Sequence, residues 1–314
     1  MNRIIVVLIF STIGFCSCSP VSDLSATGKW KKTKKGEVVV PKTPEEQFIS
    51  ENIVFDGCYQ WQHGKKFVYD GQTPNILLKP VDLNEITPDS TFHQKIFTFH
   101  SFGEYTTFSG KKNVSLIFEC DGKKYKFDTD KTFDEISDTS YRPMIPNLIS
   151  LDEINKLAEL LKGKQLYIRT PHWYALSGER IDGKKLIPVE VKDIVVGNMT
   201  LPVKLIFTDS EGKEAMIFLS LKTRSETGET RIFDRLFSFD NPRLQYPAIG
   251  DEAWRLITEG KLEKGMTKEE CRLSRGVPED VKRIPTYNGL REQWIYGLNE
   301  YLYFEDGLLT DFRI

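Results

Sequence analysis

The sequence contains few of the residue patterns from which enzymes build active sites. It has four histidines, His63, His93, His100 and His172, and no two of them show the H-x-x-x-H spacing of a zinc site. No C-x-x-C pair, no glycine-rich phosphate loop after a strand pattern and no G-x-S-x-G nucleophile elbow is present. We therefore predict no catalytic residue, no cofactor and no metal site, and the sequence favours a non-enzymatic protein.

The sequence also lacks an excess of charge and a long apolar segment. Lys and Arg number 43 and Asp and Glu number 45, so nothing indicates a nucleic-acid partner. No stretch approaches the roughly 20 apolar residues of a membrane-spanning helix. With 28% charged and 39% hydrophobic residues over 314 positions, the composition is typical of a globular protein with two or three domains.

The start of the chain predicts an export signal. Arg3 precedes a short apolar run, residues 4–15, and small residues follow it, which is the pattern of a secretory signal. Cys18 follows Phe-Cys-Ser and resembles the cysteine at which bacterial lipoproteins are cleaved and diacylated. We expect residues 1–18 to be this signal and Cys18 to carry the lipid. Ordinary cleavage without lipid is the alternative. The expected location is the bacterial cell envelope, lipid-anchored at the outer membrane.

Residues 19–43 lack apolar periodicity and are rich in lysine. A coil of this length spans roughly 25–30 Å, which is enough to hold a folded domain clear of the lipid headgroups. We interpret the segment as a tether. An alternative role for its lysines is adhesion to anionic lipid, worth ~1 kcal/mol for each lysine near the surface.

Two small, mainly-β modules are expected next, at residues 44–148 and 149–246. Each begins with a predicted short helix, since Thr43-Pro44-Glu45-Glu46 and Ser150-Leu151-Asp152-Glu153 both place an acidic residue three positions after a capping hydroxyl. The second helix has an apolar stripe of Ile154, Leu157 and Leu161. Short strand patterns with frequent turn signals favour barrels or sandwiches.

The two modules show a similar order of segments, which predicts that they are distant repeats. Residues 81–86 match 189–194, and residues 114–118 match 203–207. The separation between matched segments is not constant. The first module is therefore expected to hold an insertion near residues 92–108.

Residues 247–314 carry the clearest local signals. Asp251 and Thr267 are predicted to begin two helices, the second with a T-x-x-E capping box, and Gly276 is placed to end it. Strands are predicted at 282–287, 290–296 and 301–305, and 308–313 fits a fourth. Asn288-Gly289 and Asp306-Gly307 are dipeptides typical of two-residue hairpin turns. The fold class expected for the whole chain is α+β.

This last segment resembles a known family. The residues that carry the resemblance are Gly265-Met266-Thr267, Gly276-x-Pro278, Glu292-x-Trp294-x-Tyr296 and Tyr303-Phe304-Glu305-Asp306-Gly307. They are similar to the SmpA/OmlA (BamE-like) outer-membrane lipoproteins, over about 65 of the 314 residues. The resemblance implies an ααβββ fold and a non-enzymatic role in envelope assembly. Cys271 and Arg275 depart from the family pattern.

Three cysteines remain after the signal. Cys58 and Cys120 fall in one expected module, and in an oxidising envelope they could form a disulfide; separate buried thiols are the alternative. Cys271 occupies a helix position that is expected to face the core.

Two functions of different class follow from these patterns. The first is docking of envelope proteins through an aromatic face of the C-terminal sheet. A four-residue loop at 297–300 would place Trp294, Tyr296, Tyr301 and Tyr303 on one outward face. The alternative is that the neighbouring β module covers this face. The second is a periplasmic or surface hydrolase, with a cleft between the two middle modules around His172.

Overall fold

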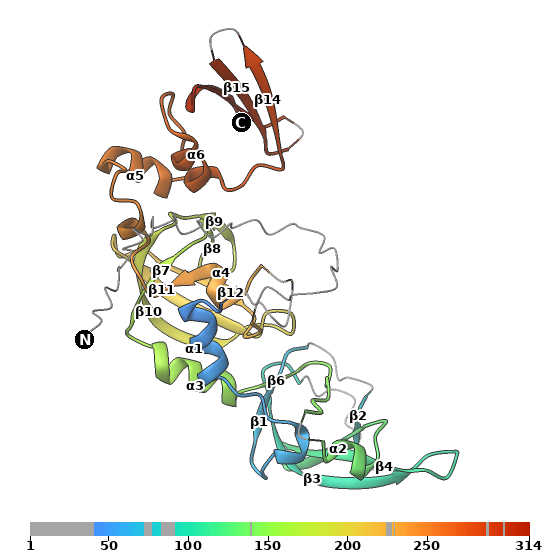
Figure 1. Cartoon of the computed structure of the whole chain (residues 1–314). Helices are drawn as coiled ribbons and strands as arrows, with labels where there is room; N and C mark the ends of the chain where they lie inside the picture. Colours follow the sequence, from blue (N-terminus) through green and yellow to red (C-terminus); the bar gives the residue numbers. More distant parts are fainter. Residues whose placement is uncertain are drawn as a thin grey trace, which may run out of the picture.

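The computed structural model describes residues 41–71, 77–82, 92–138, 140–223, 228, 230–286, 289–297 and 299–314. The expected signal, Cys18 and nearly all of the tether lie outside these residues. The described residues form an α+β fold that is mostly β, with three antiparallel sheets arranged in a row (Figure 1). None of the helices within these ranges is long and apolar enough to cross a membrane.

The first sheet unit (residues 57–150) has the strand order β2-β5-β4-β3-β1-β6. Its core is mainly aromatic: Phe67, Phe97 and Phe118 are buried and their rings pack edge-to-face or tilted against neighbouring rings. Its elements are η1 (Cys58–Gln60), β1 (Lys66–Tyr69), β2 (Leu78–Pro80), β3 (Ile96–Thr106), β4 (Lys112–Cys120), β5 (Lys123–Asp128), α2 (Phe133–Ile136) and β6 (Leu148–Ser150).

The second sheet unit (residues 44–52 and 151–239) has the strand order β13-β7-β10-β11-β12-β8-β9 and curves like half of a barrel (Figure 1). Its core is mainly aliphatic, and Trp173 packs against Phe207 inside it. Its elements are α1 (Pro44–Asn52), α3 (Asp152–Leu161), β7 (Gln165–Ile168), β8 (His172–Tyr174), β9 (Arg180–Asp182), β10 (Ile187–Val196), β11 (Val203–Asp209), β12 (Glu214–Leu219), α4 (Phe233–Leu236) and β13 (Phe237–Ser238).

The two sheet units have the same topology. The order β6-β1-β3-β4-β5-β2 corresponds strand by strand to β13-β7-β10-β11-β12-β8, and β9 is an additional edge strand. The two sheet units also share a β-bulge at the same place. The register of β3 with β4 shifts next to Phe118, and the register of β10 with β11 shifts next to Phe207. Such a bulge inserts an unpaired residue into one strand, here His100 and Lys192.

This topology decides between the two sequence matches. Residues 114–118 and 203–207 occupy equivalent strands, β4 and β11. The match of 81–86 with 189–194 is wrong, because 189–194 belongs to β10, and the counterpart of β10 is β3.

The expected first module, residues 44–148, needs correction at its start, because α1 does not lead the first sheet unit. Ile49 and Ile53 are buried in the core of the second sheet unit. The Glu45 carboxylate accepts hydrogen bonds from the Ser238 hydroxyl (3.3 Å) and the Phe239 amide (3.0 Å). The described chain therefore begins in the second sheet unit with α1, forms the first sheet unit, and returns to the second through α3.

The helix starts were predicted with mixed success. The Thr43 side chain caps α1 as expected, accepting from the Glu46 amide at 3.1 Å. The cap proposed at Ser150 is wrong, since Ser150 is the last residue of β6 and its buried hydroxyl has no hydrogen-bond partner among the described residues. The stripe of Ile154, Leu157 and Leu161 is buried as predicted.

The C-terminal unit (residues 247–314) follows a 3-10 turn, η3 (Pro242–Gln245). It contains α5 (Asp251–Thr258), α6 (Lys268–Arg275), β14 (Asp280–Thr286), β15 (Gly289–Ile295), β16 (Tyr301–Glu305) and β17 (Leu308–Arg313). The predicted capping box is present: the Thr267 hydroxyl accepts from the Glu270 amide, and the Glu270 side chain accepts from the Thr267 amide. Gly276 has the positive φ expected at the helix end, and Asp306 and Gly307 have the positive φ of the predicted turn. Asn288 lies outside the described residues.

The second and C-terminal units are joined by direct contacts around Lys185. Its amide donates to the Thr258 carbonyl of α5 (2.9 Å), and its ammonium donates to the Ser274 carbonyl near the end of α6 (2.5 Å). Leu186 packs on the small apolar cluster of Ile249, Trp254 and Ile257. These contacts hold the C-terminal unit against the second sheet unit.

Candidate docking site

The long β3–β4 hairpin presents a fully exposed aromatic side chain. The hairpin extends beyond the body of the first sheet unit, and its tip is the outermost part of that end of the molecule in Figure 1. Phe108 lies at this tip, and its exposed fraction is 116% of the reference value, so nothing in the described chain covers it. A fold gains nothing from an uncovered phenylalanine, because its apolar surface stays in water.

The conformation of the tip does not depend on Phe108. The Thr107 amide donates to the Lys111 carbonyl (2.9 Å), and the Thr107 hydroxyl accepts from the Lys111 amide (3.1 Å) and bonds the Ser109 hydroxyl (2.9 Å). Gly110 supplies the positive φ of the turn. The turn is therefore fixed by its neighbours, and the ring projects from it.

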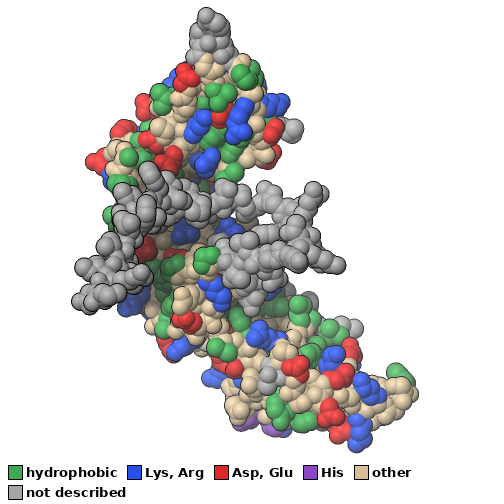
Figure 2. Space-filling view, viewed as in Figure 1, with side chains coloured by type: hydrophobic (Ala, Val, Ile, Leu, Met, Phe, Trp, Pro, Cys, Tyr) green, Lys and Arg blue, Asp and Glu red, His purple; other side chains and the backbone are tan. Residues whose placement is uncertain are grey.

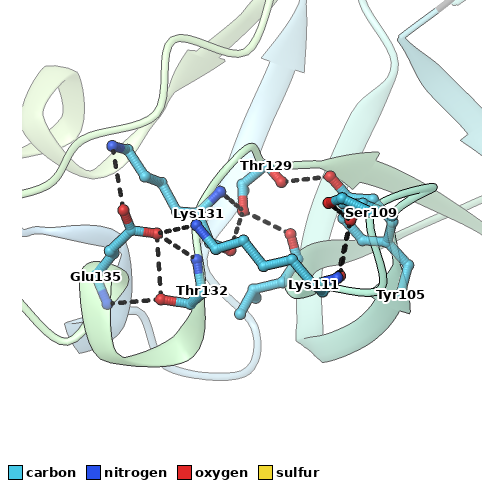
Figure 3. A network of polar contacts seen from close by, with 9 residues as sticks. Tyr105, Ser109, Lys111, Thr129, Lys131, Thr132 and Glu135 are labelled. Carbon is cyan, nitrogen blue, oxygen red and sulfur yellow. Dashed lines mark hydrogen bonds and ion pairs between the residues drawn. The ribbon is translucent and has the colours of Figure 1, made fainter.

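A polar network fixes the hairpin to the following segment (Figure 3). The Tyr105 hydroxyl donates to the Thr129 carbonyl at 2.6 Å, and the Lys111 ammonium lies 3.3 Å from the Glu135 carboxylate. Glu135 also forms the capping box of α2 with Thr132. The Thr132 amide, and then Lys111, lower the pKa of Glu135 to about 2, so the carboxylate stays charged. These contacts hold the hairpin in one position relative to α2.

The lysines beside the tip are neutralised by carboxylates. Lys111 pairs with Glu135, and Lys112 lies 2.8 Å from Glu104. The surroundings of Phe108 are thus polar and balanced in charge. An apolar centre inside a polar rim is the usual anatomy of a protein–protein interface.

The equivalent hairpin of the second sheet unit shows what such a tip can do. The β10–β11 turn is closed by the Gly197 amide on the Pro202 carbonyl (2.8 Å). At its tip the Met199 amide donates to the Asp70 carboxylate of the first sheet unit at 2.8 Å. The tip of the β10–β11 hairpin therefore contacts the neighbouring sheet unit, whereas the tip of the β3–β4 hairpin points into solvent.

The four aromatics predicted to form one outward face do not do so, which corrects that prediction. Trp294 is buried against Phe304 and Leu302. The Tyr296 ring is half-buried against the same cluster, and its hydroxyl donates to the Gly276 carbonyl (3.0 Å). Tyr301 and Tyr303 are on the opposite face of the sheet.

The cause is a register shift of one residue. Ile295 pairs with Tyr301 and Trp294 pairs with Leu302, so the loop has five residues, 296–300, and not four. It is closed by the Tyr296 amide on the Glu300 carbonyl (3.0 Å). Because side chains alternate along a strand, this shift moves the β15 side chains to the opposite face, while Tyr301 and Tyr303 of β16 stay on the outward face as predicted.

Cys58 and Cys120 do not form a disulfide with each other, and the alternative of separate buried thiols is the one that the structure shows. Cys58 and Cys120 are free and buried, and they belong to different clusters of the first sheet unit. Burial raises the pKa of each thiol to about 11. Cys271 is fully buried, as its helix position predicted, and burial raises the pKa of its thiol to about 12.

His172 does not lie in an enzyme-like arrangement. Its Nδ1 accepts a hydrogen bond from Arg180 at 2.9 Å. Burial, and then the charge of Arg180, lower the pKa of the imidazole. Within the described ranges no hydrogen bond joins this ring to a carboxylate or a nucleophile, and no cluster of three or more potential metal ligands occurs.

A cleft of about 330 Å³ lies between the second sheet unit and α5. Of the charged side chains that line it, Lys184 pairs with Glu211, and Arg243 pairs with Asp251 of α5. The Asp209 carboxylate accepts the backbone amides of Glu211 and Lys213. Each of these charged groups is held by a partner on the protein, so the described lining residues present no cluster of free charge to a ligand. We therefore place the candidate site at the hairpin tip and not in this cleft.

Phe108 was not singled out from the sequence. The available signal was an aromatic residue inside a turn pattern, Thr107-Phe108-Ser109-Gly110, where polar residues are the rule. Comparisons with models of protein families, with curated proteins and with solved structures find no match to this chain.

Proposed function

We propose that this chain is a non-enzymatic protein of the bacterial cell envelope that docks another envelope protein through the β3–β4 hairpin, with Phe108 as the central contact. The observation that carries the proposal is the fully exposed Phe108 ring on a turn that is fixed without it. Buried aromatic side chains supply a large share of binding energy at protein interfaces. A pre-ordered hairpin also loses little conformational freedom on binding.

The balance of charge favours a protein partner over a lipid surface. A segment that adheres to anionic lipid needs unpaired cations, each worth ~1 kcal/mol near the surface. Lys111 and Lys112 are both paired with carboxylates. A phenylalanine in a neutral polar rim instead fits an apolar pocket on a protein.

The export signal predicted from the sequence and the order of elements in the C-terminal unit support the envelope part of the proposal. Lipid on Cys18 and a tether of residues 19–43 would hold the sheet units near a membrane without inserting them. The order of two helices followed by an antiparallel sheet agrees with what the SmpA/OmlA-like motif implies, with one strand more than that family has. We assign the C-terminal unit to the same assembly role on this resemblance.

The proposal is tested with Phe108→Ser in the full chain, crosslinked in intact envelopes and purified. Leu244→Ser is the matched control, since Leu244 is a large exposed apolar residue (77%) far from the hairpin. Loss of a hot-spot ring worth about 2 kcal/mol corresponds to an affinity about 30-fold lower. We expect Phe108→Ser to lose a specific crosslinked protein, with the thermal transition unchanged, and Leu244→Ser to retain it. The proposal would be contradicted if both variants recovered the crosslinked protein equally. It would also be contradicted if Phe108→Ser lost only binding to protein-free lipid vesicles.

A further inference from the structure

Two histidines that are far apart in the sequence meet at one corner of the first sheet unit. His63 precedes β1, and His100 is the bulged residue of β3. Their ring centres are 5.3 Å apart and their planes are nearly perpendicular, at 89°. Figure 2 shows histidine side chains gathered at the surface of this unit, and His63 is exposed.

The hydrogen bonds at this corner settle which nitrogen of His63 is free. Its Nδ1 lies 3.1 Å from the His100 carbonyl oxygen. A carbonyl only accepts, so Nδ1 carries the proton and donates, and in the neutral ring Nε2 keeps its lone pair. His100 has its Nδ1 bonded to the Ser101 hydroxyl at 3.0 Å. Metal-binding histidines are typically oriented in this way, with the second ring nitrogen bonded to a backbone carbonyl or a polar group.

The spacing of the rings fits a shared ion. Imidazole nitrogens bind zinc at about 2.0–2.1 Å, so two imidazoles on one tetrahedral ion have ring centres about 5 Å apart. The observed 5.3 Å agrees with this arrangement. The backbone around the pair is also fixed: the Gly64 amide donates to the Phe99 carbonyl (2.9 Å), and the Phe99 amide donates to the Lys65 carbonyl (2.7 Å).

The second sheet unit provides an internal comparison. There the Gly163 amide donates to the Val191 carbonyl (2.8 Å), in the same place as Gly64 on Phe99. Residues 162 and 192 therefore correspond to His63 and His100. Both are lysines, and Lys162 forms an ion pair with Asp193 at 3.0 Å. The corner is thus stable with an ordinary surface ion pair, and the fold does not require two imidazoles there.

We propose that His63 and His100 form a binding site for one divalent transition-metal ion of the kind that prefers imidazole, such as Zn²⁺. Nε2 of each ring supplies one ligand. The described residues offer no third protein ligand in this cluster, so water or a group from another molecule completes the coordination. The site is separate from the hairpin tip and does not depend on the proposed docking function. Sequence spacing could not reveal it, because the two histidines are 37 residues apart.

The test is isothermal titration of the tag-free full chain with Zn²⁺. We expect one equivalent to bind, and we expect His63→Gln with His100→Gln to weaken binding at least tenfold. His93→Gln is the control, since His93 is an exposed histidine of the same unit, and it should leave the affinity within twofold.

A second variant keeps the test independent of folding. His63→Lys, His100→Lys and Ser101→Asp together give this corner the residues of the second sheet unit, so the unit should fold and should not bind Zn²⁺. The proposal is overturned if the native chain takes up no zinc, if either histidine-free corner binds as well as the native one, or if His93→Gln loses as much affinity as the double variant.

Discussion

The buried ammonium of Lys185 makes the junction between the second and C-terminal units sensitive to pH. Its contact with the Ser274 carbonyl uses one of the carbonyls that the end of α6 leaves without a partner in the helix. Burial, and then the charge of Arg275, lower the pKa of Lys185 from 10.5 to about 8. Lys185→Met removes the titrating group and keeps an apolar side chain of similar length.

The sign of the effect follows from the direction of the shift. Below pH 8 the amine is charged in the folded and in the unfolded chain, and the folded state carries the cost of burying the charge. Between pH 8 and 10.5 the unfolded chain binds more protons, so stability rises with pH. A shift from 10.5 to about 8 corresponds to about 3 kcal/mol in all, of which about 2 kcal/mol falls between pH 7 and 9.5.

Urea unfolding of the native chain and of Lys185→Met, each at pH 7 and 9.5, measures this difference. The native chain should gain about 2 kcal/mol relative to the variant over that interval. The description of the junction would be wrong if the difference in unfolding free energy between the native chain and the variant were the same at both pH values. It would also be wrong if NMR showed Lys185 titrating near its ordinary pKa of 10.5, because the ammonium would then be hydrated.

Further predictions concern the C-terminal sheet and the thiols. Trp294→Ala should lower the free energy of unfolding by about 3–5 kcal/mol, because the ring is buried. Tyr303→Ala should change it by less than about 1 kcal/mol, because that ring is exposed. Equal losses of stability in denaturant unfolding would indicate that both rings lie on the same face. Cys58, Cys120 and Cys271 should resist a thiol reagent at pH 8 in the native chain and react fully in denaturant, because burial raises their pKa values to about 11 or 12; fast native labelling, or fewer than three thiols in denaturant, would contradict the assignment.

Local signals predicted the features that depend on neighbouring residues. The Thr267 capping box, the Gly276 helix end and the Asp306-Gly307 turn each involve atoms a few residues apart, and each is present. The buried stripe of α3 is a periodicity within one helix, and it is present as well. Such features depend on backbone geometry and on residues a few positions away, and not on distant contacts.

Features that depend on distant contacts were not predicted. One additional residue in the 296–300 loop moved Trp294 to the core face, because alternation transmits a single slip along the whole strand. The packing of α1 on the second sheet unit involves a hydrogen bond between Glu45 and Phe239, which are 194 positions apart in the sequence. The exposure of Phe108 depends on the absence of a covering segment, and a sequence pattern does not report such an absence.

A photo-crosslinking amino acid at position 108 of the full chain, activated in intact cells, tests the proposed docking most directly. The same amino acid at position 199, where the equivalent tip already contacts the first sheet unit, serves as the control. We predict one discrete adduct with an envelope protein from position 108 and none from position 199. Adducts with lipid alone, no adduct, or the same adduct from both positions would contradict the proposal that Phe108 docks a protein partner.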